Sequence, residues 1–365
     1  MILSKRILIV AILSIAVYSC KKEEDSQQTT SAKFDETPYV LNHEGLPPPM
    51  LPEDNALTVE KVKLGKMLFY EPMLSKDGSM SCASCHAQPD AFSDTAKFSI
   101  GVEGLPGKRQ AMAVFNMAWN NNEFFWDGRA HLLRDQALKP IEDPLEMNET
   151  LENVVTKLSG SQMYKDQFIR AFGSSEITSE KMSLAMEQFE LTIVSNKSKY
   201  DEYLAGNAAL TASEERGREL FFLEYNPSFP DQSGADCAHC HSGPNFENDR
   251  YMNNGLDTDG DITDIGREEV TLNPMDKAKF KLPSLRNIEL TPPYMHDGRF
   301  ETLEEVVDHY NNGIKPSATL DPALEMTRDK GLMLDDQDKK DLVAFLKTLT
   351  DHTLSNNPDF ADPFL

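Results

Sequence analysis

The distribution of apolar residues along the chain predicts helices that are joined by long polar loops. In residues 335–349 the apolar side chains recur at the 0, 3, 4, 7 spacing that places them on one buried helical face. Residues 180–194 show a similar helical pattern. No run of segments alternates apolar and polar residues as a multi-stranded sheet would require. We therefore predict an all-α fold.

The two halves of the chain repeat the same short motifs in the same order. A predicted leading helix occurs twice, at residues 64–70 and 216–222. The second copy begins with the capping-box sequence of residues 211–214, in which each polar side chain satisfies the free amide of the other residue. Further along each half comes an Asp-Gly-Arg turn, at residues 126–129 and 296–299. This order predicts an internal duplication.

The first residues have the pattern of an export signal. Lys5 and Arg6 precede an apolar run over residues 7–17, which is too short for a membrane-spanning helix. Ser19 and Cys20 follow in the arrangement of a bacterial lipoprotein cleavage site, so we predict that Cys20 carries a lipid. Ordinary cleavage that leaves a spare thiol is the alternative. The polar, then Pro-rich stretch after Cys20 suits a tether.

These observations divide the chain into four parts. We predict a signal peptide at residues 1–19, a tether at 20–50, an N-terminal domain at 51–204 and a C-terminal domain at 205–365. Hydrophobic residues at 39% and charged residues at 26% exclude a disordered chain. The net charge of −24 would repel phosphate backbones, so we expect no nucleic-acid partner.

The cysteines supply the strongest chemical signal. Cys82 and Cys85 precede His86, and Cys237 and Cys240 precede His241, so the C-x-x-C-H pattern occurs twice. It is the attachment pattern of c-type haem, in which both thiols bind one haem and the histidine binds its iron. A thioredoxin-like pair would need a βαβ context, and a shared zinc site would leave both histidines unexplained. Structural disulfides are the third alternative.

The repeat also identifies equivalent positions in the two halves that could face the two haem irons. Thirteen residues after the aspartate of each Asp-Gly-Arg turn stand Pro140 and Tyr310. A tyrosine can supply a phenolate to iron, whereas proline has no side-chain donor. One iron would then have six ligands, and the other an open side that binds small molecules. Met295, His296 and His309 are rival ligands, and a tyrosine with its hydroxyl at the surface is the simplest alternative for Tyr310.

On these motifs, residues 50–350 resemble the bacterial dihaem cytochrome c peroxidases and their relatives, the MauG proteins. The resemblance implies two tandem cytochrome c-like domains, each with one covalently bound haem c. It implies that the N-terminal haem is the peroxide site and the C-terminal haem transfers electrons. The family's distal glutamine, proline and glutamate correspond to Gln136, Pro140 and Glu146, and its tryptophan between the haems corresponds to Trp126.

The chemistry explains these residue types. Cleavage of a peroxide O–O bond requires a proton to move from one oxygen to the other, and a poorly solvated carboxylate can move it near neutral pH. Glu146 is the candidate acid and base, and Gln136 would hydrogen-bond the peroxide. Glu146 could instead be one more exposed acid in residues 142–146, and Trp126 could be a core residue.

Two departures from the peroxidases favour the MauG side of the family. Many of the peroxidases carry a histidine after the first haem motif that caps the peroxide-binding iron, but residues 87–125 contain none. His131 would be the substitute to look for. At position 310 the peroxidases usually have methionine, whereas the MauG proteins have tyrosine. An anionic oxygen ligand lowers the reduction potential of its haem.

The family also binds a calcium ion between its domains. The resemblance assigns it to Gln110, Thr291 and Pro293, although asparagine is usual where Gln110 stands. Residues 257–261 suggest an EF-hand loop, but the glycine is misplaced, so we predict a solvated loop.

We therefore predict a periplasmic or cell-envelope lipoprotein that reduces hydrogen peroxide at the N-terminal haem. A small redox protein, such as a cytochrome c or a cupredoxin, would deliver electrons through the C-terminal haem. The alternatives are a MauG-like oxidase, in which both haems store oxidising equivalents taken from peroxide and oxidise a protein or organic substrate, and a non-enzymatic electron carrier. A homodimer is compatible with all three of these hypotheses.

Overall fold

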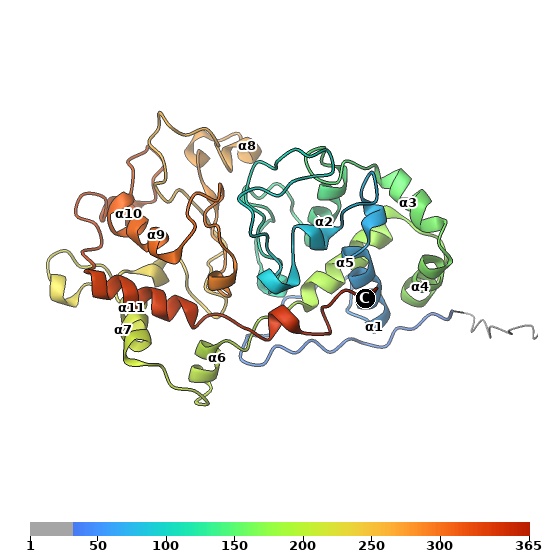
Figure 1. Ribbon diagram of the computed structural model, residues 1–365, viewed down its shortest axis with the longest axis horizontal. Helices are drawn as coiled ribbons and strands as arrows, with labels where there is room; N and C mark the ends of the chain where they lie inside the picture. The colour runs from blue at the N-terminus through green and yellow to red at the C-terminus, as the bar shows by residue number, and fades with distance from the viewer. Residues whose placement is uncertain (1–31) are drawn as a thin grey trace, which may run out of the picture. The chain divides into compact units, whose positions relative to one another are not determined.

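The computed structural model describes residues 32–365 and is mainly helical (Figure 1). Cys20 and the predicted signal peptide lie outside the described residues. The helices are α1 (Val59–Phe69), α2 (Leu133–Glu142), α3 (Leu151–Ser159), α4 (Gln162–Phe172), α5 (Ser179–Thr192), α6 (Lys199–Leu204), α7 (Ala212–Phe222), α8 (Glu268–Thr271), α9 (Leu303–Asp308), α10 (Pro322–Glu325) and α11 (Asp336–Lys347). No helix among the described residues is long and apolar enough to cross a membrane.

The N-terminal half is built around the pair α1 and α5, with α2, α3 and α4 beside it (Figure 1). Its core contains Leu64, Leu68, Tyr164 and Met186, all of them fully buried. Gly65 lets the two helices approach closely, because a Cβ atom there would overlap the backbone carbonyl of α5. The leading helix predicted at residues 64–70 is therefore the C-terminal part of α1.

The C-terminal half repeats this arrangement with α7 and α11. A Cβ atom on Gly217 would overlap the Asp341 carbonyl of α11 in the same way. Phe221, Phe345 and Leu349 lie at the centre of this second core. The matching helix pairs confirm the internal duplication that the motifs predicted.

The helix boundaries agree with the capping signals in the sequence. Thr211 and Glu214 form the predicted capping box at the start of α7. Asp335 caps α11 by accepting hydrogen bonds from two backbone amides of its first turn. The helices predicted at 180–194 and 335–349 are α5 and α11, each two residues shorter at its C-terminal end than predicted.

One small ladder departs from the all-helical expectation. Strands β1 (Tyr251–Met252) and β2 (Phe280–Lys281) pair antiparallel, with Tyr251 opposite Lys281. Strands of two residues give no period-2 signal, so the sequence pattern could not reveal them. The helical prediction is confirmed for the described chain apart from this ladder and several isolated bridges.

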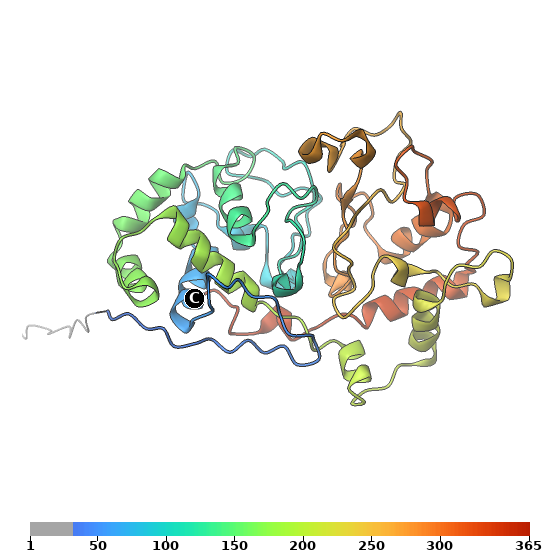
Figure 2. The same cartoon turned by 180° about the vertical axis from the view of Figure 1, so that it is seen from behind.

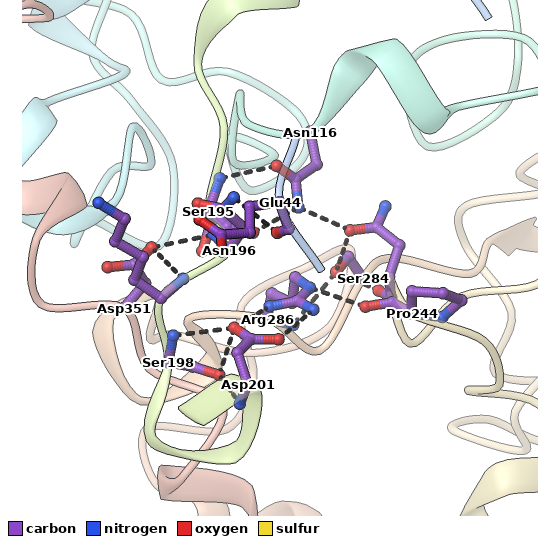
Figure 3. A network of polar contacts seen from close by, with 12 residues as sticks. Glu44, Asn116, Ser195, Asn196, Ser198, Asp201, Pro244, Ser284, Arg286 and Asp351 are labelled. Atoms are coloured by element: carbon purple, nitrogen blue, oxygen red, sulfur yellow. Dashed lines mark hydrogen bonds and ion pairs between the residues drawn. The ribbon is translucent and has the colours of Figure 1, made fainter. Parts of the chain in front are cut away.

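The segment that joins the two halves is fixed by polar contacts (Figure 3). After α5 ends, Ser195 exchanges hydrogen bonds with Asn116, and Asp201 on α6 forms a two-point ion pair with Arg286, with both distances 2.8 Å. Tyr200 of α6 packs in the C-terminal core, upstream of the domain limit predicted after residue 204. The domain limits remain a prediction.

This ion pair should matter for stability. Replacing Arg286 by methionine leaves the largely buried Asp201 carboxylate without its partner, which should lower the free energy of unfolding by about 3–5 kcal/mol. Urea unfolding followed by circular dichroism measures the change. The matched control is Arg328→Met, since the Arg328–Glu325 pair is exposed to solvent and should contribute little to stability. Equal losses of unfolding free energy in both variants would contradict the stabilising role of the Arg286–Asp201 ion pair.

The C-terminal end of the chain returns to the N-terminal half (Figure 2). The Gln88 side chain donates hydrogen bonds to the carbonyls of Leu354 and Asn357, at 3.0 and 2.8 Å. Phe360 packs edge-on against Phe92, close to the first cysteine motif. The last residues of the chain therefore support the half that carries the first motif.

Candidate active site

Both cysteine motifs fold in the same way. Each forms a short 3-10 turn, in which the histidine amide donates to the carbonyl of the first cysteine, from His86 to Cys82 at 2.9 Å and from His241 to Cys237 at 2.8 Å. The cysteines of both motifs form no disulfide within the described chain. The two thiols and the imidazole of each motif therefore lie within one turn of backbone, as covalent attachment of one haem requires.

The two histidine rings are oriented alike. His86 Nδ1 lies 3.2 Å from the Phe92 carbonyl, and His241 Nδ1 lies 3.1 Å from the Phe246 carbonyl. A proton on Nδ1 makes this contact a hydrogen bond and leaves Nε2 free as a metal ligand. Burial lowers the pKa of both imidazoles, that of His241 to about 4, so they are neutral and able to bind iron. The residues thus fit a c-type haem in each half.

A cavity of about 910 Å³ adjoins the first motif. Residues from both halves of the chain line it. Most residues that the sequence assigned to the peroxide site or to calcium belong to this wall: Cys85, His86, Gln110, Trp126, Gln136, Pro140, Glu146, Thr291 and Pro293. The fold therefore brings together residues that stand more than 200 positions apart in the sequence.

The proposed distal residues reach this cavity from α2 and the turn that follows it. Gln136 and Pro140 are four residues apart, so they share one face of the helix. Glu146 comes after the helix end, and its backbone carbonyl accepts a hydrogen bond from the Val102 amide at 2.8 Å. The adjacent Met147 carbonyl accepts from the Lys76 amide at 3.0 Å, which fixes the turn from two sides.

The Glu146 carboxyl lies in an environment that suits proton transfer. Burial raises its pKa to about 7; Asp143 adds to this rise, and Arg129 partly opposes it. The alternative that Glu146 is simply an exposed acid does not fit this position. A carboxyl with a pKa near 7 can both accept and return a proton at neutral pH.

Trp126 connects the two halves. Its indole N–H donates to the Gln110 carbonyl at 2.7 Å, and its own carbonyl accepts from the Lys281 amide of β2, also at 2.7 Å. Both the ring and the backbone are thus held in place. The side chain lies in the cavity wall, between segments that belong to different repeats.

The two Asp-Gly-Arg turns share the same bridge and the same spacing to the next helix. An antiparallel bridge spans each turn, from Phe124 to Ala130 and from Tyr294 to Phe300. A helix follows at the same distance, namely α2 in the first half and α9 in the second. The comparison of Pro140 with Tyr310 therefore rests on equivalent positions of the fold.

Tyr310 lies in a π-helical turn (His309–Gly313) directly after α9. Such turns are uncommon and are often found at functional sites. Burial raises the pKa of Tyr310 to about 12, with a smaller opposing effect of Asn254 and small further rises from Cys240 and Cys237. The phenol is therefore close to the thiols of the second motif.

The rival ligands lie in different surroundings. His296 stacks on Phe280 with ring centroids 3.6 Å apart, and His309 Nε2 lies 3.0 Å from the Asn254 carbonyl. Both rings are thus engaged with other groups. Met295 remains, because it lines the large cavity and lies beside the same asparagine as Tyr310.

His131, the substitute considered for the missing cap, is exposed and does not line the cavity. Among the described residues that do line it, His86 is the only histidine.

The residues expected to bind calcium offer few free oxygen atoms. The Gln110 amide nitrogen donates to Ser93 and to the Asp94 carbonyl, so only its amide oxygen is available to a cation.

The sequence reasoning missed two charged residues of this wall. Arg109 binds both Asp127 of the first Asp-Gly-Arg turn and Asp264 of the C-terminal half, which links the halves beside Trp126. Glu190 on α5 is buried, and burial raises its pKa to about 8. An acid within the apolar pattern of 180–194 was the available signal for Glu190, whereas nothing local distinguished Arg109.

Fold and site together define a haem-dependent oxidoreductase, and comparisons with known proteins agree. The family model described as di-haem cytochrome c peroxidase matches residues 59–209. With the similarities given next, the chain belongs to the di-haem cytochrome c peroxidase family.

Two relatives are similar over most of their length. The chain is 38% identical to the methylamine utilization protein MauG of Methylorubrum extorquens, over 82% of this chain and 80% of the relative. It is 36% identical to the cytochrome c551 peroxidase of Nitrosomonas europaea, over 84% and 83%. Among solved structures, a MauG-like protein associated with microbial copper homeostasis matches with a TM-score of 0.79 and 35% identity, over 89% of this chain and 99% of that one. Relatives thus carry both peroxidase and MauG names.

Proposed function

We propose that this protein reduces hydrogen peroxide to water at the N-terminal haem site, with electrons delivered through the C-terminal one. Each turnover consumes one peroxide, two electrons and two protons and yields two waters. The observation that carries the proposal is the single cavity wall that combines His86, Gln136, Glu146 and Trp126. Peroxide consumption with a reduced cytochrome c or cupredoxin as donor tests it, and a protein that consumes no peroxide with any donor would refute it.

The chain's own residues would hold the two haems. Cys82 and Cys85 would form thioether bonds with one haem, and Cys237 and Cys240 with the other. His86 would bind the first iron, and His241 with Tyr310 the second. The haems supply iron that takes up electrons and binds small molecules.

Glu146 would move the proton in the peroxide reaction. As a carboxylate it accepts a proton from one peroxide oxygen, and as an acid it returns that proton to the departing oxygen. The Gln136 amide would orient the peroxide by donating a hydrogen bond. Pro140 presents no side-chain donor on the same helix face, so it leaves room beside these two residues.

A smaller pocket of about 270 Å³ borders the large cavity, since Glu146 belongs to both walls. Phe125, Arg129, Lys139 and Glu146 belong to its wall. The Arg129 guanidinium lies 3.6 Å from the centre of the Phe125 ring, so these two side chains pack together in the wall.

The second candidate function is a MauG-like oxidase that withdraws electrons from a protein or organic substrate. Two observations favour it: the cavity wall has no second histidine, and Tyr310 lies near the second motif. Adding peroxide to the fully oxidised protein separates the two. A rapid spectral change without any electron donor would support the oxidase, and a reaction only after one-electron reduction would support the peroxidase. A pure electron carrier would show neither response.

The raised pKa of Glu146 predicts a pH dependence. Below about pH 7 the carboxyl is protonated and cannot accept the peroxide proton, so kcat/KM for peroxide should rise with pH and level off above pH 7. An unperturbed glutamate would place this step near pH 4.5 instead. Stopped-flow measurements between pH 5 and 9 locate the step. A flat profile across this range would contradict the assignment of Glu146.

The remaining proposals concern location and partners. The signal pattern and Cys20 support export and a lipid anchor, which would place the enzyme in the periplasm or cell envelope, where c-type haem is attached. The calcium site at Gln110, Thr291 and Pro293 rests on the family resemblance and on their common place in the cavity wall. A small redox protein as donor and a homodimer are further proposals that direct measurement can test.

A further inference from the structure

Asn254 lies between two side chains that could bind the second haem. Its amide nitrogen is 3.3 Å from the Tyr310 hydroxyl oxygen and 3.2 Å from the Met295 sulfur. A primary amide carries two N–H donors, so both hydrogen bonds can form at once. The phenol oxygen and the sulfur are both acceptors in this arrangement.

The position of Asn254 is set independently of these two contacts. Its backbone carbonyl lies 3.0 Å from His309 Nε2, and His309 is the residue directly before Tyr310 in the π-helical turn. The preceding Asn253 is buried and donates to Ser317 and Thr319 at 3.0 and 2.9 Å. The amide of Asn254 is therefore presented to Tyr310 and Met295 by a fixed segment.

Met295 is also held in a particular conformation. Its backbone φ of +75° lies in the left-handed region, which is unfavourable for a residue other than glycine and persists where the surroundings enforce it. Its sulfur lies within hydrogen-bond distance of the same Asn254 amide nitrogen as the Tyr310 hydroxyl, so the sulfur is close to the phenol that would bind the second iron. Methionine sulfur is a common haem ligand, and one that gives a higher potential than tyrosine does.

We propose that Asn254 is a positioning residue that selects Tyr310 over Met295 as the axial ligand of the second haem. A hydrogen bond to the phenol oxygen holds it in the orientation of an anionic ligand, and a hydrogen bond to the sulfur engages the lone pair that would bind iron. This inference rests on the proposed function, in which Tyr310 is that ligand.

Replacing Asn254 by leucine removes both donors. Met295 should then compete for the iron, because its sulfur is no longer engaged. The reduction potential of the second haem should rise by at least ~59 mV, because sulfur replaces anionic oxygen. This rise equals a tenfold shift of the equilibrium toward the reduced form. X-ray absorption of the holoprotein should show an iron–sulfur contribution that is absent from the wild type.

Two further variants make the test specific. Met295→Leu alone should leave the iron ligands unchanged, and in Asn254→Leu/Met295→Leu the iron–sulfur contribution should disappear. Asn254→Asp keeps the size of the side chain but removes the donors, so it repeats the test if the leucine variant does not fold. Wild-type ligation and potential in both Asn254 variants, or equal shifts with and without Met295, would overturn the proposal.

Peroxide consumption is measured separately on the same samples. If the wild-type protein consumes no peroxide but the Asn254 variants show the predicted ligand exchange, the peroxidase is refuted and the role of Asn254 stays intact. Normal peroxide consumption with no effect of the Asn254 variants would refute only the positioning role.

Discussion

Glu146→Gln should lower kcat for peroxide reduction by about 10²- to 10⁴-fold, the range that general acid–base catalysis contributes in enzymes. Glutamine keeps the size of the side chain but can neither accept nor return the proton. The pH step expected near pH 7 should also disappear, because the group that titrates there is gone. Stopped-flow mixing with peroxide and steady-state turnover measure both effects.

The matched control is Glu152→Gln on α3. Glu152 is exposed, and its carboxylate makes no side-chain hydrogen bond or ion pair in the described chain. This variant should react like the wild type. Haem content and absorption spectra of both variants show whether the site is otherwise intact. A Glu146→Gln protein with full turnover would return Glu146 to the role of an ordinary acid.

Tyr310→Met should raise the reduction potential of the second haem by on the order of 100 mV or more, within the ~0.8 V over which axial ligands set haem potentials. The thioether stabilises reduced iron, whereas the phenolate stabilises oxidised iron. A higher potential would also bring this site closer to the peroxidases that carry methionine there. Potentiometric titration of both haems measures the change, and the first haem should not shift by a comparable amount.

Tyr203→Met provides the control for this substitution. Tyr203 is also partly buried in the C-terminal half, but it stacks on Tyr200 of α6 and lies outside the cavity wall. Its replacement should leave both potentials unchanged. If Tyr310→Met behaves in the same way, Tyr310 does not bind the second iron, and the ligand must be sought at Met295 or elsewhere.

Several features could be read from the sequence because they depend on neighbours along the chain. The helix α11 follows from a local apolar period, and the start of α7 follows from a capping box four residues long. The cysteine motifs are equally local, since each places its reactive groups within one turn of backbone. The duplication was visible because both copies keep these local patterns.

Other features depend on contacts between distant segments. Arg109 gives no local signal, because its partner Asp264 is 155 positions away. Asn254 stands in a polar stretch that suggests only a loop, and its place beside Tyr310 arises from contacts of the segment after β1 with the π-helical turn. The route of the chain between its halves was likewise set by the packing of Tyr200 into the C-terminal core.

The sequence by itself thus determined the helical class, the duplication and the two C-x-x-C-H motifs, and it supplied the prediction of the distal residues. Only the tertiary structure decided that Glu146 and Trp126 line one cavity, that His131 is exposed and lies outside the cavity wall, and that Met295 and Tyr310 share one asparagine. The physical reason is that residue types and short spacings fix which chemistry is available. Burial, pKa and the choice between neighbouring ligands depend on groups that only the folded chain brings within a few ångströms.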